Sequence, residues 1–205
     1  MINVHRPPHI YLPKEIYFLT ARTFQGIKYF KGEKKEVLKK FIARAVEVYK
    51  VNVYAWVILE NHYHLLISFR CDELNCAGCN EIRPVRNKDE FRSAQFVKPK
   101  TPSSNQLANF IKYIHRGSSR EINKLDGCPG RKVWYQYFDR CIRCEREFYN
   151  YFAYIHCNPL KHGFVGEFDR LADYSFSSYS ECQNKLGRGW MREAVSNCLV
   201  LEKIN

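Results

Sequence analysis

Two apolar segments separated by only two residues constrain the fold of this chain more than any other feature. Residues 51–59 and 62–69 have the composition of β-strands, and only Glu60 and Asn61 join them, so we expect an antiparallel strand pair. His62 and His64 stand two residues apart in the second strand. Because alternate side chains of a strand point to the same face, both imidazoles are directed at one place. Such a pair can hold a metal ion, although the spacing alone also fits an ordinary amphipathic strand.

A tyrosine-rich segment in the second half of the chain has a helical period. Its apolar side chains recur at positions i, i+3, i+4 and i+7: Phe148, Tyr151, Phe152 and Ile155. Pro159 disfavours helical backbone at Asn158, so we expect the helix to end at about that residue. Tyr154 and Asn158 are four residues apart, which places a phenol and an amide on one flank. Periodicity alone does not choose among Tyr149, Tyr151 and Tyr154 as a functional residue.

Three segments resemble the signatures of the REP-associated tyrosine transposases, which are HUH single-strand transposases of the small insertion-sequence type. They are residues 61–66 (NHYHLL), 154–165 (YIHCNPLKHGFV) and 175–179 (SFSSY), in the family's order, and the similarity spans roughly residues 10–180. The resemblance implies that Tyr154 is the nucleophile, that His62 and His64 are metal ligands, and that Asn158 contributes a further polar ligand. Many relatives carry Met-Pro where this chain has Leu-Glu before the first motif. Glu60 shares the parity of the histidines, so it either approaches the metal or lies at the site margin.

These residue types suit cleavage of a phosphodiester. A tyrosine phenol ordinarily has a pKa of about 10, so it needs a nearby cation or base in order to attack phosphorus. A divalent ion on two histidines and an amide would polarise the phosphate and leave positions open for phosphate oxygen and water. We expect Mg²⁺ or Mn²⁺, although imidazole ligands also accept later transition metals. By resemblance, the protein is a DNA nicking and strand-transfer enzyme that forms a 5′-phosphotyrosine intermediate on hairpin-flanked DNA.

The charge of the chain agrees with a nucleic-acid partner. Lys and Arg number 33 against 21 Asp and Glu, a formal charge of +12, which favours association with polyanions. We expect the partner to be single-stranded or hairpin DNA, bound by a monomer or a homodimer. No apolar window reaches the length of a membrane span and no signal peptide opens the chain. This predicts a cytoplasmic, nucleoid-associated protein without a membrane partner.

The alternative function is a domesticated nucleic-acid-binding protein that keeps the fold without cutting. The complete set of His62, His64, Tyr154 and Asn158 favours cleavage, because a pure binder needs no nucleophile beside a metal. A histidine phosphoesterase, the third possibility, would use repeated His-x-Thr/Ser motifs, whereas the sequence has a single His-x-His.

The order of elements predicts the fold class. Strands are expected at residues 16–23, 51–59, 62–69 and 132–137, with helices at 34–49 and from 103. This order predicts an α+β, ferredoxin-like antiparallel sheet of the HUH endonuclease type, with helices on one face and the third strand central. The tyrosine helix is then an addition that reaches the histidines. We expect one domain over residues 1–205, with a cysteine-containing insertion at 70–102 and a C-terminal appendage at 180–205.

The insertion carries a cluster of thiols. The cluster consists of Cys71, Cys76 and Cys79. Its Cys-x2-Cys spacing is typical of half a structural zinc site, so we expect bound Zn²⁺ and a fourth ligand. Cys128 is the first candidate, on the expectation that the third strand ends where the fourth begins. Cys141 and Cys144 are the rival pair. The alternative is that all nine cysteines are reduced, mostly buried thiols.

Overall fold

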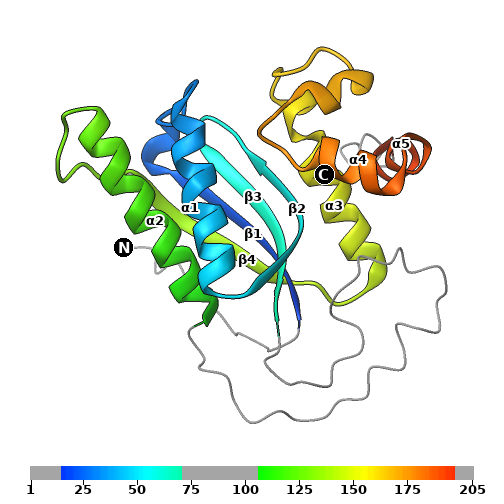
Figure 1. Ribbon diagram of the computed structural model, residues 1–205, viewed down its shortest axis with the longest axis horizontal. Helices are drawn as coiled ribbons and strands as arrows, with labels where there is room; N and C mark the ends of the chain where they lie inside the picture. The colour runs from blue at the N-terminus through cyan, green and yellow to red at the C-terminus, as the bar shows by residue number, and fades with distance from the viewer. Residues whose placement is uncertain (1–14, 71–105, 197–205) are drawn as a thin grey trace, which may run out of the picture.

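A computed structural model of the chain describes residues 15–70 and 106–196 (Figure 1). The strands are β1 (Ile16–Thr23), β2 (Val51–Ile58), β3 (His62–Phe69) and β4 (Trp134–Cys141). The α-helices are α1 (Lys34–Val48), α2 (Gln106–Leu125), α3 (Glu145–Lys161), α4 (Tyr179–Leu186) and α5 (Arg188–Ser196). Short 3-10 turns lie at η1 (Phe24–Gly26) and η2 (Phe168–Asp173). Within the described ranges, no helix is long and apolar enough to cross a membrane.

The four strands form one sheet in the order β2-β3-β1-β4, and every neighbouring pair is antiparallel. This is the ferredoxin-like arrangement, so the predicted fold class is confirmed. The strand with the two histidines, β3, lies in the interior of the sheet between β2 and β1. In the β1–β3 ladder, Thr20 is paired with His64, and Arg22 with His62. Directly paired residues of an antiparallel ladder share a face, so these four side chains lie on the same side of the sheet.

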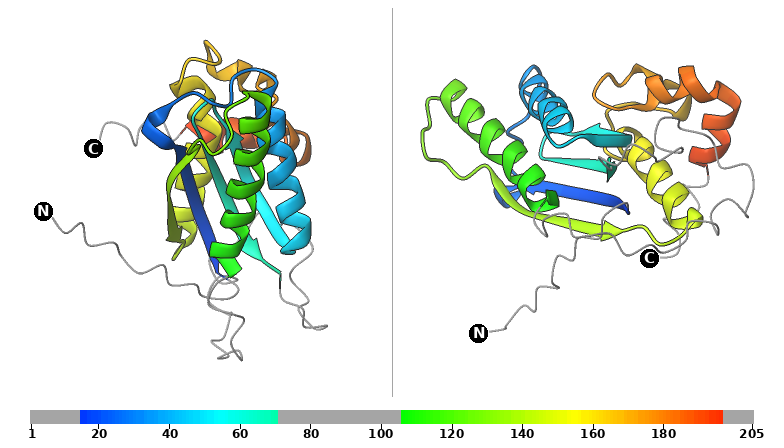
Figure 2. Two further views of the ribbon diagram at one scale, coloured as in Figure 1. Left: turned by 90° about the vertical axis from the view of Figure 1, so that its left-hand side faces the viewer. Right: turned by 60° about the horizontal axis from the view of Figure 1, so that its bottom comes forward.

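Helices cover both faces of the sheet, as the views in Figure 2 show. On one face, α1 and α2 lie side by side over a core that includes Leu19, Tyr63 and Leu65. On the other face, α3 packs with Phe18 and Leu66, and α4 and α5 complete that cluster. The alternation of β3 therefore places its odd-numbered side chains under α1 and α2 and turns the even-numbered histidines toward α3. The helix that carries the tyrosines thus covers the face that carries the imidazoles.

The end of α3 departs from the prediction. The helix passes through Pro159 and ends at Lys161, three residues beyond the expected end at Asn158. Asn158 and Pro159 are buried, and the backbone N–H of His162 closes the last turn on the carbonyl oxygen of Asn158 at 3.0 Å. A proline removes only one backbone hydrogen bond from a helix. Packing of this buried turn therefore outweighs the local preference of the residue before proline.

The residues after α3 fasten this helix to the edge of the sheet. The backbone N–H of Ile58 in β2 donates to the carbonyl of Phe176 at 2.8 Å, and the N–H of Ser178 donates to the carbonyl of Trp56 at 3.0 Å. Farther along, Trp190 of α5 packs edge-on against Phe152 of α3, with ring centroids 5.9 Å apart. The chain beyond the tyrosine helix thus holds α3 from two sides, against β2 and against α5.

Candidate active site

The two histidines of β3 are both oriented by hydrogen bonds from their Nδ1 atoms. His62 donates from Nδ1 to the side-chain carbonyl oxygen of Asn61 at 2.7 Å, and Nδ1 of His64 forms a hydrogen bond with the hydroxyl of Thr20. The ring centroids are 5.1 Å apart. With each Nδ1 engaged, the Nε2 atom of each ring is the one left to bind a further group. A partner on one ring nitrogen that fixes the other nitrogen for a metal is typical of metal-binding histidines.

Asn158 brings an amide to the same place from α3. Its side chain is fully buried, and Nδ2 donates to the carbonyl oxygen of Tyr154 at 2.7 Å. Two buried side-chain atoms of the described residues have no hydrogen-bond partner, Oδ1 of Asn158 and Nε2 of His64. Leaving such atoms buried and unpaired is costly. Both are lone-pair donors, so a cation between them would satisfy both, and the residues fit a divalent metal.

The surroundings of the histidines keep both imidazoles neutral. Burial, together with the nearby His162 imidazole, lowers the pKa of His62 to about 4, and the polar side chain of Asn158 opposes this change. Burial, and then the charge of His62, lowers the pKa of His64 well below its ordinary value. A metal ligand must be unprotonated. Both rings therefore have the protonation state for metal binding at neutral pH.

The structure distinguishes the three candidate tyrosines. The ring of Tyr154 lies edge-on to His64, with centroids 5.2 Å apart, and Nζ of Lys161 lies 5.6 Å from the centre of the Tyr154 ring. Tyr151 instead stacks on Phe18 at 4.2 Å, and the ring of Tyr149 lies 6.2 Å from that of Trp190 in α5. Tyr154 is thus the tyrosine beside His64, while Tyr151 and Tyr149 contribute to packing around the helix.

The sequence assigns no role to three residues at the site, Thr20, Arg22 and His162, and leaves two alternatives for a fourth, Glu60. Thr20 and Arg22 lie beside the histidines because of the register in which β1 pairs with β3. A sequence motif carries no information on strand register. His162 follows α3, and its ring lies 4.9 Å from that of His62. Glu60 is at the margin, where its carboxylate pairs with Lys28 at 3.1 Å. In the described part of the chain no three His, Cys, Asp or Glu side chains form a metal-binding group, so an ion on the two histidines would need a donor of another kind, which the amide of Asn158 offers.

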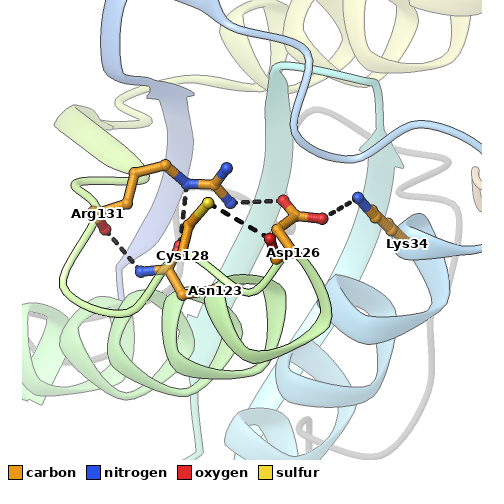
Figure 3. A network of polar contacts seen from close by, with 5 residues as sticks. All are labelled: Lys34, Asn123, Asp126, Cys128 and Arg131. Atoms are coloured by element: carbon orange, nitrogen blue, oxygen red, sulfur yellow. Dashed lines mark hydrogen bonds and ion pairs between the residues drawn. The ribbon is translucent and has the colours of Figure 1, made fainter.

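Of the predicted zinc ligands, only Cys128 lies among the residues that the structure describes. Cys71, Cys76 and Cys79 lie outside the described residues. Cys128 is exposed in the loop after α2, where its thiol donates to the backbone carbonyl of Asp126 at 3.3 Å. Figure 3 shows this loop held together by the Asp126 carboxylate, which pairs with Arg131 at 2.6 Å and also with Lys34. Zinc binding stays a prediction.

The reason for choosing Cys128 is wrong. Because β3 and β4 are both antiparallel to β1, they run parallel to each other, and the end of β3 lies opposite to the start of β4. Ser68 is paired with Ile16, and Cys141 with Tyr17, so β3 and β4 both end beside the start of β1. Among the cysteines of β4 and its flanking loops, the rival Cys141 lies at the end of the sheet where the insertion begins, and Cys128 lies at the far end.

The two strand histidines lie on the face of a ferredoxin-like sheet that the tyrosine helix covers, which is the arrangement that the resemblance to the HUH transposases predicts. The comparisons with known proteins agree. The chain is 22% identical over 164 residues to the "Putative REP-associated tyrosine transposase" of Haemophilus influenzae, covering 80% of this chain and 79% of the relative. It also matches the structure of a REP-associated tyrosine transposase bound to a REP hairpin, with a TM-score of 0.57, 16% identity, and 90% and 86% of the two chains covered.

No family model matches the sequence. The resemblance that the three motifs indicate is nevertheless confirmed, because the relative and the structural neighbour are both REP-associated tyrosine transposases. The chain is thus similar in sequence to one of these proteins and has the fold of the other.

Proposed function

We propose that this protein is a metal-dependent endonuclease and strand transferase that cuts single-stranded DNA next to a hairpin, with Tyr154 as the nucleophile. One observation carries the proposal: the unpaired atoms Nε2 of His64 and Oδ1 of Asn158 are buried beside the tyrosine whose ring lies 5.2 Å from His64. A protein that only binds DNA gains nothing from such a costly arrangement. The names of the relatives, both tyrosine transposases, support the same activity.

In the proposed reaction, the phenolic oxygen of Tyr154 attacks phosphorus and the bond between phosphorus and the 3′-oxygen breaks. The phenol proton leaves, the 3′-oxygen takes up a proton, and the 5′-phosphate stays on the tyrosine. His62, His64 and Asn158 would hold Mg²⁺ or Mn²⁺, which supplies charge neutralisation at the scissile phosphate. Attack of a 3′-hydroxyl on the phosphotyrosine reverses the step and joins strands. Two hydrogen bonds, one that His62 donates to Asn61 and one between His64 and Thr20, hold the imidazoles in place throughout.

The surface around the site suits a nucleic acid. Arg22 is exposed and is paired with His62 in the β-ladder. Lys161 lies over the ring of Tyr154. One cation is therefore near the histidines and another is near the tyrosine. The edge strand β4 adds two exposed rings, Tyr135 at 47% and Phe138 at 50% exposure. Rings next to cations bind unpaired bases by stacking while the cations contact phosphates. The structural neighbour's REP hairpin supports hairpin DNA as the substrate class.

Covalent capture of DNA tests the proposal. The purified protein is incubated with a labelled oligonucleotide that has a hairpin and single-stranded flanks, with Mg²⁺, with Mn²⁺ or with EDTA, and is then separated under denaturing conditions. The proposal predicts a labelled protein band with either metal and none with EDTA. Tight binding of the oligonucleotide without an adduct under any of these conditions would instead establish the alternative, a domesticated protein that binds DNA without cutting it.

A further inference from the structure

A third imidazole, that of His162, lies at the site, and the motifs assign no role to it. His162 follows the last residue of α3, and its backbone N–H donates to the carbonyl of Asn158, which ties it to the helix turn that carries the buried amide. Its side chain is exposed. Its ring lies edge-on to that of His62, with centroids 4.9 Å apart and planes at 65°.

This spacing is the one expected of two rings on a shared ion. A metal–nitrogen distance of about 2.1 Å places the ring centroid about 3.2 Å from the metal, so two neighbouring ligands have centroids about 4.5–5.2 Å apart. The pair His62 and His64, at 5.1 Å, falls within this interval, and so does the pair His62 and His162, at 4.9 Å. His62 thus has two neighbouring imidazoles at distances that fit ligands of one ion.

We infer that His162 is a further metal ligand, which joins His62, His64 and Asn158 when the ion binds. The inference rests on the proposed metal site. The three described rings do not yet converge, so His162 must turn its ring toward the ion, and its exposed position after the helix leaves room for this movement. As an exposed side chain, His162 can bind the ion last. The buried His64 is held beforehand by its hydrogen bond with Thr20.

A third imidazole changes which metals the site prefers. Mg²⁺ favours oxygen donors and keeps its waters, whereas imidazole binds Mn²⁺ better, and Co²⁺, Ni²⁺ and Zn²⁺ better still. His162 should therefore increase the affinity for these transition metals and have little effect on Mg²⁺. The chain would then select Mn²⁺ or a later metal over Mg²⁺ more strongly than a site built of two histidines and an amide.

The test measures metal binding without DNA. Co²⁺ is titrated into the metal-free full-length protein and followed by its visible absorption, which reports the number and type of ligands, and Mg²⁺ affinity is measured by competition. His162→Ala should weaken Co²⁺ binding at least about tenfold, alter the absorption spectrum and leave Mg²⁺ affinity within about twofold. The neighbouring, equally exposed Lys161→Ala is the control. It removes a positive charge and no ligand, so it should not weaken Co²⁺ binding.

The outcomes separate this inference from the proposed function. If His162→Ala binds Co²⁺ with wild-type affinity and spectrum, while His64→Ala does not bind it, the inference is wrong and the metal site stands. If the wild-type protein binds neither Co²⁺ nor Mn²⁺, the metal site itself is wrong, and the inference falls with it.

Discussion

Replacing Ser178 should detach the tyrosine helix from the sheet without touching the reacting groups. His156, on α3 between Tyr154 and Asn158, donates from Nδ1 to the carbonyl of Phe152 at 2.9 Å, so its Nε2 accepts the hydroxyl proton of Ser178 at 2.8 Å. The same hydroxyl oxygen accepts the backbone N–H of Trp56 in β2 at 2.9 Å. One serine thus links the helix to the sheet edge.

The magnitude follows from the groups that lose a partner. Ser178→Ala leaves the N–H of Trp56 and Nε2 of His156 unpaired in the interior, at a cost of about 1–3 kcal/mol for each buried group. We therefore expect the free energy of unfolding to fall by about 2–6 kcal/mol, a large part of the roughly 5–15 kcal/mol typical of a domain. Because Tyr154 and Asn158 flank His156 on α3, adduct formation should slow as well, by about 100-fold for a displacement of about 1 Å.

Ser177→Ala is the matched control. Ser177 is buried to the same degree, but its hydroxyl makes longer bonds, 3.2 Å to the carbonyl of Tyr174 and 3.4 Å from the N–H of Tyr179, and neither reaches α3. Urea unfolding and the rate of adduct formation are measured for both variants at temperatures where both are folded. The reasoning is refuted if the two serine variants lose the same stability and the same rate.

Three further predictions concern the metal, the solution pH and the salt. Replacing both His62 and His64 with Ala should abolish adduct formation in Mg²⁺ or Mn²⁺ while circular dichroism still reports a folded protein, and Asn158→Ala should lower the rate less; an active double variant would contradict the metal site. His115 and His156 are buried with pKa values lowered to about 3 by burial, so the unfolded chain binds more protons and stability falls with pH from 6.5 downward, by about 2 kcal/mol per histidine at pH 5. Unfolding curves that superimpose at pH 7 and pH 5 would count against neutral, buried rings. Affinity for single-stranded DNA should fall with salt, with a slope of about −0.7 in log K against log[salt] for each phosphate contacted, and a flat response would exclude the positive charge as the source of affinity.

The sequence predicts most of the fold because local patterns and topology agree. The bounds of β1 and β3 are the same in the structure as in the prediction, since strand composition and alternation change sharply at their ends. The sequence predicts an end of α3 that is three residues too early. Burial of Asn158 and Pro159 stabilises the last turn, and a rule based only on the residue before proline takes no account of tertiary packing. The argument for Cys128 is wrong for a different reason. β3 and β4 both pair antiparallel with β1, so they run parallel to each other and the end of β3 lies far from the start of β4.

The candidate site is predictable only as far as motifs extend. Spacing and resemblance bring His62, His64 and Tyr154 to attention, and the structure places them together. Asn61, which orients His62, lies within the first motif. Thr20 of β1, which orients His64, and Ser178 after η2, which bonds to His156 of the tyrosine helix, come from elsewhere in the chain. Their roles depend on strand register and on a hydrogen bond between segments 22 residues apart, which no periodicity reports. His162 lies within the second motif, but the resemblance gives it no role, and its contact with His62 is seen only in the structure.

Peptide mapping of the covalent adduct tests the central claim most directly. The wild-type protein is incubated with the hairpin oligonucleotide and metal, digested with protease and nuclease, and the peptide that carries the nucleotide is sequenced by mass spectrometry. The account predicts a 5′-phosphate attached to Tyr154, and no adduct from Tyr154→Phe although that variant still binds the oligonucleotide. A nucleotide on Tyr151 or Tyr149, or an undiminished adduct from Tyr154→Phe, would contradict it.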